Sequence, residues 1–160
     1  MNGTSTNQNG WRASAMRTYL NGSFLDLLPD AVKSGIVEVD KMTNNVGSTS
    51  ATTSVTATSD KVWLLSSIEA YGSTVNSGTY GPVYAAEGSQ YKYYKDLKVT
   101  TSSYSALKKY PVGSTSSASD WWLRSPDAST SGLFLGVIDG YWDNCDYADR
   151  TYGVSPGFCF

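Results

Sequence analysis

The side chains best suited to chemistry gather in one short segment near the end of the chain, residues 141–151. This segment mixes aromatic rings, carboxylates, an amide and a guanidinium with almost no aliphatic side chain, which is typical of a recognition surface rather than a core strand. Apolar blocks lie on both sides of it, residues 121–126 and residues 152–160. The pattern predicts a fixed framework that presents a contact segment.

The same inventory argues against catalysis. The 160 residues include no histidine, which removes the commonest general base, the Ser–His nucleophile pair and the ordinary zinc-ligand sets. Fourteen acids and two cysteines remain, and they are thinly spread. We therefore expect a protein that is not an enzyme, with no catalytic residue, no metal site and no cofactor.

The two cysteines, Cys145 and Cys159, could close a loop whose disulfide would contribute roughly 3 kcal/mol through lost chain entropy. Cys145 lies in the polar contact segment, and we expect it to be exposed. Cys159 stands between Phe158 and Phe160, and we expect it to be a small buried hydrophobe. The sequence favours two free thiols, with the disulfide as the alternative.

Length and charge limit the partners. A chain of this length is expected to form a single domain over residues 1–160. Charged residues make up only 16% of it and the formal net charge is −2, so no basic field is available for nucleic acid. No apolar run is long enough to cross a membrane and no signal peptide is visible, so we expect no direct membrane insertion. The Ser-, Thr-, Gly- and Tyr-rich composition is nevertheless typical of surface and appendage proteins.

The elements that must position the contact segment begin with helical patterns. Residues 11–20 have helical spacing, and Asn21-Gly22 is the expected stop. Residues 26–34 are predicted to form a second short helix with Pro29 in its first turn. Residues 36–39 then change to a strand-like pattern.

The middle of the chain has mixed signals. Residues 43–59 are predicted to be a hairpin or an exposed loop, and residues 60–65 are the clearest candidate for a buried strand. Ser66 and Glu69 have the spacing of a capping box that starts a helix. The tyrosine-rich residues 87–95 are predicted to be a partly exposed helix, with a ligand platform as the alternative.

The final block is predicted to be mostly strand. Residues 121–124 and 132–138 are expected to be core strands, Asp139-Gly140 a two-residue hairpin turn, and residues 154–160 a closing strand. We expect Trp63, Trp121 and Trp122 to belong to the core. Arg124 beside them is predicted to form a buried structural pair, with an aspartate as the candidate partner.

Several blocks of the sequence resemble a known family, and they cover nearly the whole chain. These blocks are Trp11 with residues 16–21, residues 60–66, residues 87–91, Trp121-Trp122-Leu123-Arg124-Ser125-Pro126 and residues 153–158. Together they resemble a widespread family of bacterial and phage surface domains, in which the Trp-Trp-Leu-Arg-Ser-Pro block is a distinctive marker. The resemblance implies a C-type-lectin-like α+β fold, similar also to the formylglycine-generating-enzyme group, with short helices packed on small twisted antiparallel sheets and much loop.

This lectin-like group includes the variable proteins of diversity-generating retroelements, in which a reverse transcriptase rewrites adenines at the 3′ end of the gene. The resemblance implies that such a cassette encodes the contact segment, with a variable ligand-binding region at about residues 133–152. An AAC codon randomised at its two adenines can yield Asn, Asp, Tyr, Ala, Thr, Arg or Cys, but not Trp, Lys, Glu, Gln or Met. Of residues 141–151, only Trp142 falls outside the reachable set.

The expected function is therefore ligand or receptor binding through a hypervariable surface. The expected partner is a protein or glycan receptor on a target surface, and the expected location is a phage particle or a bacterial cell surface; the sequence sets no oligomeric state. Trp142 is either an anchor or a partly buried ring. The predicted contact residues are Tyr141, Trp142, Asp143, Asn144, Cys145, Asp146, Tyr147, Asp149 and Arg150, with Phe134 and Leu135 at the border.

Two relatives of the fold are not expected to lend their chemistry. Calcium-dependent lectins place a Glu-Pro-Asn or Gln-Pro-Asp triplet before a Trp-Asn-Asp motif, whereas here only Trp142-Asp143-Asn144 appears, without a triplet. The formylglycine-generating enzymes use a cysteine pair with copper, and neither Cys145 nor Cys159 stands in a matching motif. The alternative function is a non-diversified structural or adhesive domain, in which the acids of the contact segment merely discourage strand pairing.

Overall fold

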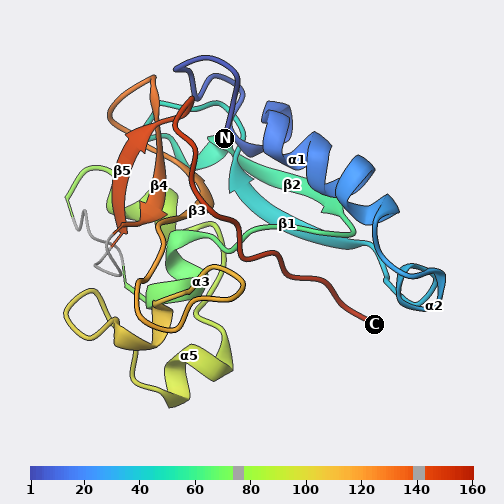
Figure 1. The fold of residues 1–160 in the computed structure, drawn as a ribbon. Coiled ribbons are helices and arrows are strands. Elements are labelled where there is room, and N and C mark those ends of the chain that lie inside the picture. Colours follow the sequence, from blue (N-terminus) through green and yellow to red (C-terminus); the bar gives the residue numbers. More distant parts are fainter. Residues whose placement is uncertain (74–77, 139–142) are drawn as a thin grey trace.

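The chain folds into short helices and two small antiparallel sheets (Figure 1). The computed structural model describes residues 1–73, 78–138 and 143–160. One sheet pairs β1 (Val39–Asn44) with β2 (Val55–Asp60). The other has the strand order β3 (Trp121–Pro126), β4 (Leu133–Val137), β5 (Asp143–Tyr147), so β5 lies at its edge. The predicted α+β class with small antiparallel sheets is confirmed.

The helices are all short. No helix in the described ranges has the length and apolar character needed to cross a membrane. The helical segments are η1 (Trp11–Ala13), α1 (Ala15–Tyr19), η2 (Leu20–Phe24), α2 (Asp30–Lys33), η3 (Thr52–Ser54), α3 (Ser67–Tyr71), α4 (Gly81–Ala85), α5 (Lys92–Asp96) and η4 (Ser105–Leu107).

The helix stop predicted at Asn21-Gly22 is confirmed in part. Helix α1 ends at Tyr19 and η2 follows directly, but Gly22 has non-helical φ and ψ of −121° and −106°, which places a kink between two helical segments. The Asn21 side chain holds the chain at this kink, because its amide donates to the Val62 carbonyl at 2.8 Å and its oxygen accepts from the Lys61 N–H at 2.8 Å. The asparagine thus also ties the helix to the segment after β2.

The second helix is shorter than predicted. Pro29 has an extended ψ of 143° and stands at the N-cap, so α2 begins after it and not at Asp26. The strand expected at residues 36–39 begins only at Val39. The hairpin expected within residues 43–59 is confirmed by the ladder between β1 and β2, which runs from Val39 opposite Asp60 to Asn44 opposite Val55.

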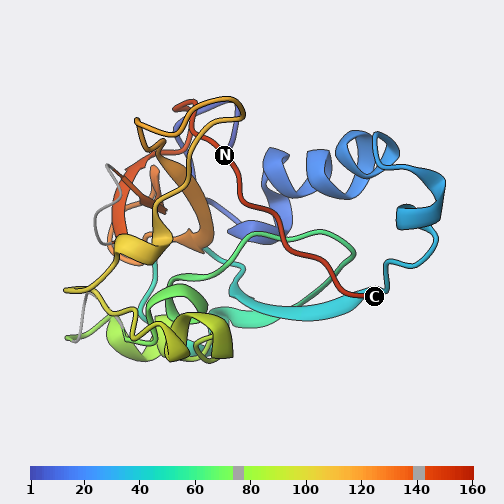
Figure 2. The same ribbon diagram turned by 60° about the horizontal axis from the view of Figure 1, so that its bottom comes forward.

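Two predicted strands are not strands. Asp60 is the last residue of β2, but residues 61–65 and residues 154–160 make only isolated bridges, Trp63 with Gly157 and Val37 with Cys159. Figures 1 and 2 show the C-terminal residues as an extended strip that crosses the molecule toward α2. Burial of residues 62–65 is therefore achieved by side-chain packing, without a regular ladder.

The predicted core strands β3 and β4 are confirmed, and β3 supplies both parts of the core. Trp121 joins the cluster that contains Tyr71, Tyr84 and Leu135, while Trp122 joins the cluster that contains Trp11, Trp63 and Phe134. Successive side chains of a strand point to opposite faces, so two adjacent tryptophans serve two clusters. The prediction that Trp63, Trp121 and Trp122 are core residues is confirmed. The Asp139-Gly140 turn lies outside the described residues.

A buried ionic cluster, formed by Lys41, Glu69, Glu87, Arg124 and Ser125, joins β1, α3 and β3. Arg124 Nη1 donates to Glu69 Oε2 and, at 2.8 Å, to the Leu64 carbonyl. Lys41 Nζ lies 2.5 Å from Glu69 Oε1. The predicted buried pair of Arg124 is confirmed, but its acid is a glutamate, not an aspartate.

The predicted capping box explains why Glu69 is available for this cluster. The Ser66 N–H donates to Glu69 Oε2 at 2.9 Å, and the Glu69 N–H donates to Ser66 Oγ at 3.3 Å. The box fixes the carboxylate at the first turn of α3, where Arg124 and Lys41 reach it. A local helix-start signal thus also positions a tertiary contact.

Candidate functional site

The described part of the contact segment forms β5 and the turn after it. The side chains of Asn144, Tyr147, Asp149 and Arg150 are exposed, whereas Asp146 is half-buried. Of the other predicted contact residues, Tyr141 and Trp142 lie outside the described residues, and the backbone of Asp143 pairs with Val137. We call residues 147–152 the contact turn.

The prediction that Phe134 and Leu135 border the contact surface is wrong. Their exposed fractions are 0% and 4%, because β4 is the central strand of its sheet and both of its faces are covered. Phe134 packs in the cluster of Trp122, and Leu135 packs in the cluster of Trp121. Both residues support the site from beneath.

The two cysteines are free thiols, as predicted, but their environments are the reverse of those expected. Cys145 is half-buried because it pairs with Leu135 and packs against the core. This burial is the larger cause that raises the pKa of its thiol to about 11, and the nearby Asp127 carboxylate is the second cause. Cys159 is exposed in the C-terminal strip. Cys145 is therefore not a favourable candidate for nucleophilic chemistry, because its thiolate is suppressed.

Side chains of β5 bind the backbone of their own strand. The Cys145 N–H donates to Asn144 Oδ1 at 2.9 Å, and the Tyr147 N–H donates to Asp146 Oδ1 at 2.7 Å. Since β5 is an edge strand, these side chains occupy backbone donors that an added strand would use. A partner is therefore more readily bound by the side chains of this edge than by strand addition.

Asp146 also anchors the contact turn. Tyr152 Oη donates to Asp146 Oδ2, and the Tyr152 ring lies on Trp122 with 4.6 Å between ring centroids. Burial and the bond to Asp146 raise the pKa of Tyr152 well above its usual value, so the hydroxyl stays protonated as a donor. Arg150 Nε lies 3.9 Å from Asp146 Oδ1. Asp146 is thus an internal organiser of the turn more than a free contact group.

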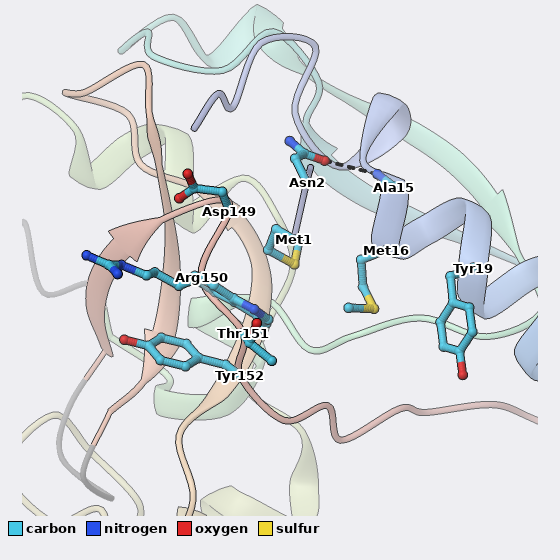
Figure 3. Close-up of a pocket in the computed structure, with 10 residues that line it drawn as sticks. Met1, Asn2, Ala15, Met16, Tyr19, Asp149, Arg150, Thr151 and Tyr152 are labelled. Carbon is cyan, nitrogen blue, oxygen red and sulfur yellow. Dashed lines mark hydrogen bonds between the residues drawn. The ribbon is translucent and has the colours of Figure 1, made fainter. Parts of the chain in front are cut away.

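A hollow of about 320 Å³, which we call the α1 hollow, lies between the contact turn and helix α1 (Figure 3). Figure 3 shows Met16 and Tyr19 extending from α1 on one side, with Thr151 and Tyr152 on the other. The N-terminal residues lie between these walls, where the Asn2 side chain accepts from the Ala15 N–H at 3.0 Å. The walls combine thioether, aromatic and polar side chains, which is a common composition of a binding pocket.

A second, mainly polar hollow of about 390 Å³ adjoins the first. It is lined by Ser5, Tyr147, Asp149 and Arg150. Asp149 and Arg150 line both hollows, so the turn separates two depressions with one carboxylate and one guanidinium between them. These groups can form charge-assisted hydrogen bonds to a ligand in either depression.

The sequence did not identify the α1 wall. Met16 and Tyr19 have the helical spacing of core residues, yet Tyr19 is exposed and Met16 is only half-buried. The predicted contact residues also left out Thr151 and Tyr152, although these two directly follow Arg150 in the sequence. No local signal marks α1 as a neighbour of a turn more than a hundred residues away.

The described residues contain no candidate metal-binding site. Outside the segments 74–77 and 139–142, no group of three or more cysteine, aspartate or glutamate side chains is arranged to hold an ion.

No curated protein matches the chain, and no solved structure matches it either. The family DUF6273, described as a domain of unknown function, matches residues 1–160, and the chain therefore belongs to this family.

Proposed function

We propose that this domain is a binding protein whose contact turn, together with the outward side chains of β5, recognises a protein or glycan receptor on a target surface. The observation that carries the proposal is the position of Asp149 and Arg150, which are exposed and line two adjoining hollows. The proposed scaffold is a C-type-lectin-like fold acting on a phage particle or a bacterial cell surface. Catalysis, a cofactor, nucleic acid and membrane insertion have no part in this function.

The chemistry of the turn suits recognition. The exposed Tyr147 ring offers a large contact area with few rotatable bonds, and Arg150 offers several directed donors. The thioether of Met16 in the α1 hollow is flexible and adapts to different apolar groups. Such a surface can accept different ligands without changes in the scaffold.

We further propose that a diversity-generating retroelement varies this surface. The outward residues Asn144, Tyr147, Asp149, Arg150 and Thr151 all belong to the set that a randomised AAC codon can yield. Within the same cassette, residues 133–152, buried positions such as those of β4 would have to remain constant to keep the core. All the described outward residues of the segment are thus compatible with the codon, which supports diversification, although the buried Ala148 is compatible with it too.

The gene itself provides the first test. Its neighbourhood should contain a reverse transcriptase gene and a near-identical copy of the codons for residues 133–152 that differs only at adenines. Sister genes should then differ at outward positions and agree at the buried ones. A gene without such a template contradicts the diversification, while leaving the binding function to be tested on the protein.

Binding is tested with arrays of glycans and of bacterial surface proteins. We expect Arg150→Ala and Asp149→Ala to weaken capture of the ligand that the wild-type domain selects, each by roughly tenfold. Lys92→Ala is the matched control, because Lys92 forms an exposed i,i+4 pair with Asp96, as Arg150 does with Asp146. Equal loss in the control, or no loss in the turn variants, contradicts the proposed recognition surface.

One observation favours the alternative, a fixed structural or adhesive module. Asn144 and Asp146 bind the backbone of their own strand, and Asp146 also holds Tyr152, so both have structural duties. A fixed module is expected to keep both residues in every sister gene. Variation at both positions in those genes would exclude it.

A further inference from the structure

The basic side chains of the domain are unevenly distributed. Residues 92–109 hold five of the twelve lysine and arginine side chains but only one of the fourteen acids. The buried residues of this segment, Tyr94, Val99 and Leu107, pack in one core cluster, so the segment forms one continuous part of the fold. We call its basic residues the lysine surface: Lys92, Lys95, Lys98, Lys108 and Lys109.

Most of the charge of the lysine surface is not neutralised by nearby acids. Lys92 forms an ion pair with Asp96 at 2.6 Å, and Lys109 lines a hollow together with Asp120. Even if each of these two acids cancels the charge of one lysine, three positive charges remain. The lysines that carry them are exposed and form no ion pair with any residue of the described ranges: Lys95, Lys98 and Lys108.

Lys98 has a backbone conformation that favours glycine. Its φ is 54°, and it follows α5 in a turn where the Val99 N–H donates to the Tyr94 carbonyl and the Lys98 N–H donates to the Lys95 carbonyl, both at 3.0 Å. These two bonds define a Schellman motif, in which glycine is the usual left-handed residue. A side chain disfavours this backbone conformation, so a lysine here is less stable than a glycine. The positive charge at residue 98 is therefore kept against the local backbone preference.

Exposed apolar side chains lie among these lysines. Tyr93 in α5 is 66% exposed, and Leu97 at the end of α5 is 48% exposed. Residues 92–109 contain no arginine, and lysine lacks the planar fork that matches one fixed carboxylate or phosphate. Flexible ammonium groups beside tyrosine and leucine are typical of a protein surface that lies on the headgroups of an anionic bilayer.

We infer that the lysine surface adsorbs on the anionic headgroups of a lipid bilayer without crossing it. The lysines meet the headgroup charges, and Tyr93 and Leu97 reach the boundary between the headgroups and the acyl chains. Figures 1 and 2 show α5 at the bottom of the molecule and the chain that follows β5 at the top, so a domain adsorbed in this way directs the contact turn away from the bilayer. The inference goes beyond the proposed function and does not require it, since the lysine surface shares no residue with the contact turn.

Sedimentation of the domain with lipid vesicles tests the inference. At low salt the wild-type domain should bind vesicles of phosphatidylcholine mixed with phosphatidylglycerol, and it should be released as salt rises, because ions screen the attraction. It should not bind vesicles of phosphatidylcholine alone. Equal binding to both kinds of vesicle overturns the inference, and so does an absence of binding to the anionic vesicles at low salt.

Variants that remove charge locate the surface. The double variant Lys95→Gln with Lys108→Gln should weaken binding to the anionic vesicles by roughly twenty-fivefold, about fivefold for each lysine. The double variant Lys33→Gln with Lys61→Gln is the matched control, because it removes the same charge from outside the lysine surface and should keep most of the binding. Equal losses in the two double variants overturn the assignment to the lysine surface.

Lys98→Gly separates binding from folding. It removes a charge and relaxes the backbone, so it should weaken vesicle binding by about fivefold while it raises the urea midpoint of unfolding. A lysine with only a structural role would not lower binding as stability rises. Vesicle binding that is unchanged in Lys98→Gly counts against the lysine surface.

The apolar side chains distinguish a bilayer from a soluble polyanion. Leu97→Asn should weaken vesicle binding by roughly fivefold, whereas Leu27→Asn, at another exposed leucine, should leave it unchanged. Binding to soluble polyphosphate without binding to vesicles identifies a different partner and overturns the inference. Arg150→Ala should leave vesicle binding unchanged, so failure of the proposed receptor recognition and failure of membrane adsorption are separate results.

Discussion

Two arginines in this domain lie beside acids, and they differ in burial and in the groups that they contact. Arg124 is 0% exposed and reaches Glu69 together with the Leu64 carbonyl and Thr43, whereas the Arg150 side chain is 62% exposed and only approaches Asp146 at 3.9 Å. A buried partner left unpaired is costly, while an exposed pair contributes little to stability. The buried arginine therefore holds the scaffold, whereas the exposed one is available for the recognition that we propose.

The largest expected effect is in the buried ionic cluster. Arg124→Ala should lower the free energy of unfolding by about 3–5 kcal/mol, because it leaves the Glu69 carboxylate buried with one cation fewer. Urea denaturation measures this change. Arg150→Ala is the control and should change the free energy of unfolding by less than about 1 kcal/mol. Similar losses of unfolding free energy in the two variants would show that the two arginines do not differ in their contribution to stability.

The next effect is a pH dependence in the same cluster. Burial raises the pKa of Glu87 from 4.5 to about 7, so between these values the folded state binds more protons than the unfolded state. Stability contributed by protonated Glu87 is present below pH 4.5 and is lost as pH rises to about 7, by on the order of 3 kcal/mol.

Glu69 shows the opposite direction. Burial alone would raise its pKa, but Arg124 and Lys41 outweigh burial and lower it, so its contribution is lost only as pH falls below 4.5. Burial lowers the pKa of the N-terminal amine to about 6, so unfolding measured between pH 4.5 and about 6 should report mainly Glu87, and Glu87→Gln should flatten the curve there. A wild-type unfolding free energy that does not change with pH in this range would contradict the raised pKa of Glu87.

A smaller effect is expected where the contact turn is anchored. Tyr152→Phe keeps the ring on Trp122 but removes the hydroxyl that donates to Asp146, and it should cost about 1 kcal/mol of unfolding free energy. Hydrogen exchange should rise at the Arg150 N–H, which bonds to the Tyr147 carbonyl in the same turn. Tyr147→Phe, at an exposed tyrosine, is the control and should change neither quantity.

The smallest expected effect on stability lies at the sheet edge. Asn144→Ala removes the acceptor of the Cys145 N–H and should change the free energy of unfolding by less than about 0.5 kcal/mol. It should nevertheless promote concentration-dependent association, measured by sedimentation, because an edge donor becomes available. Asn144→Asp retains an acceptor and should remain like wild type; association in that variant too would argue against this explanation.

Elements with a strong local signal could be predicted from the sequence. The capping box at Ser66 and Glu69, the apolar strands β3 and β4, and the hairpin of β1 and β2 depend on short-range pattern. The segments that failed depend on distant partners. Residues 60–65 have a strand-like composition, but their neighbour, the C-terminal strip, meets them only at Trp63.

The candidate site was predictable only in part, for a related reason. Composition selected residues 141–151, of which Asn144, Tyr147, Asp149 and Arg150 are exposed in the structure, but the side of a strand on which a residue lies depends on register. Cys145 faces the core because it pairs with Leu135, and no spacing in the sequence defines that pairing. The α1 wall with Tyr19 is joined to the turn only by the tertiary fold.

The self-capped edge of β5 also limits how this surface can evolve. Position 144 must offer a short acceptor to the next N–H if the strand is not to expose a donor, which asparagine and aspartate do and tyrosine, alanine or cysteine do not. Position 146 carries the further demand of binding Tyr152. Under the diversification that we propose, many random draws at these two positions would therefore yield domains prone to self-association, and the usable repertoire would be concentrated in the contact turn.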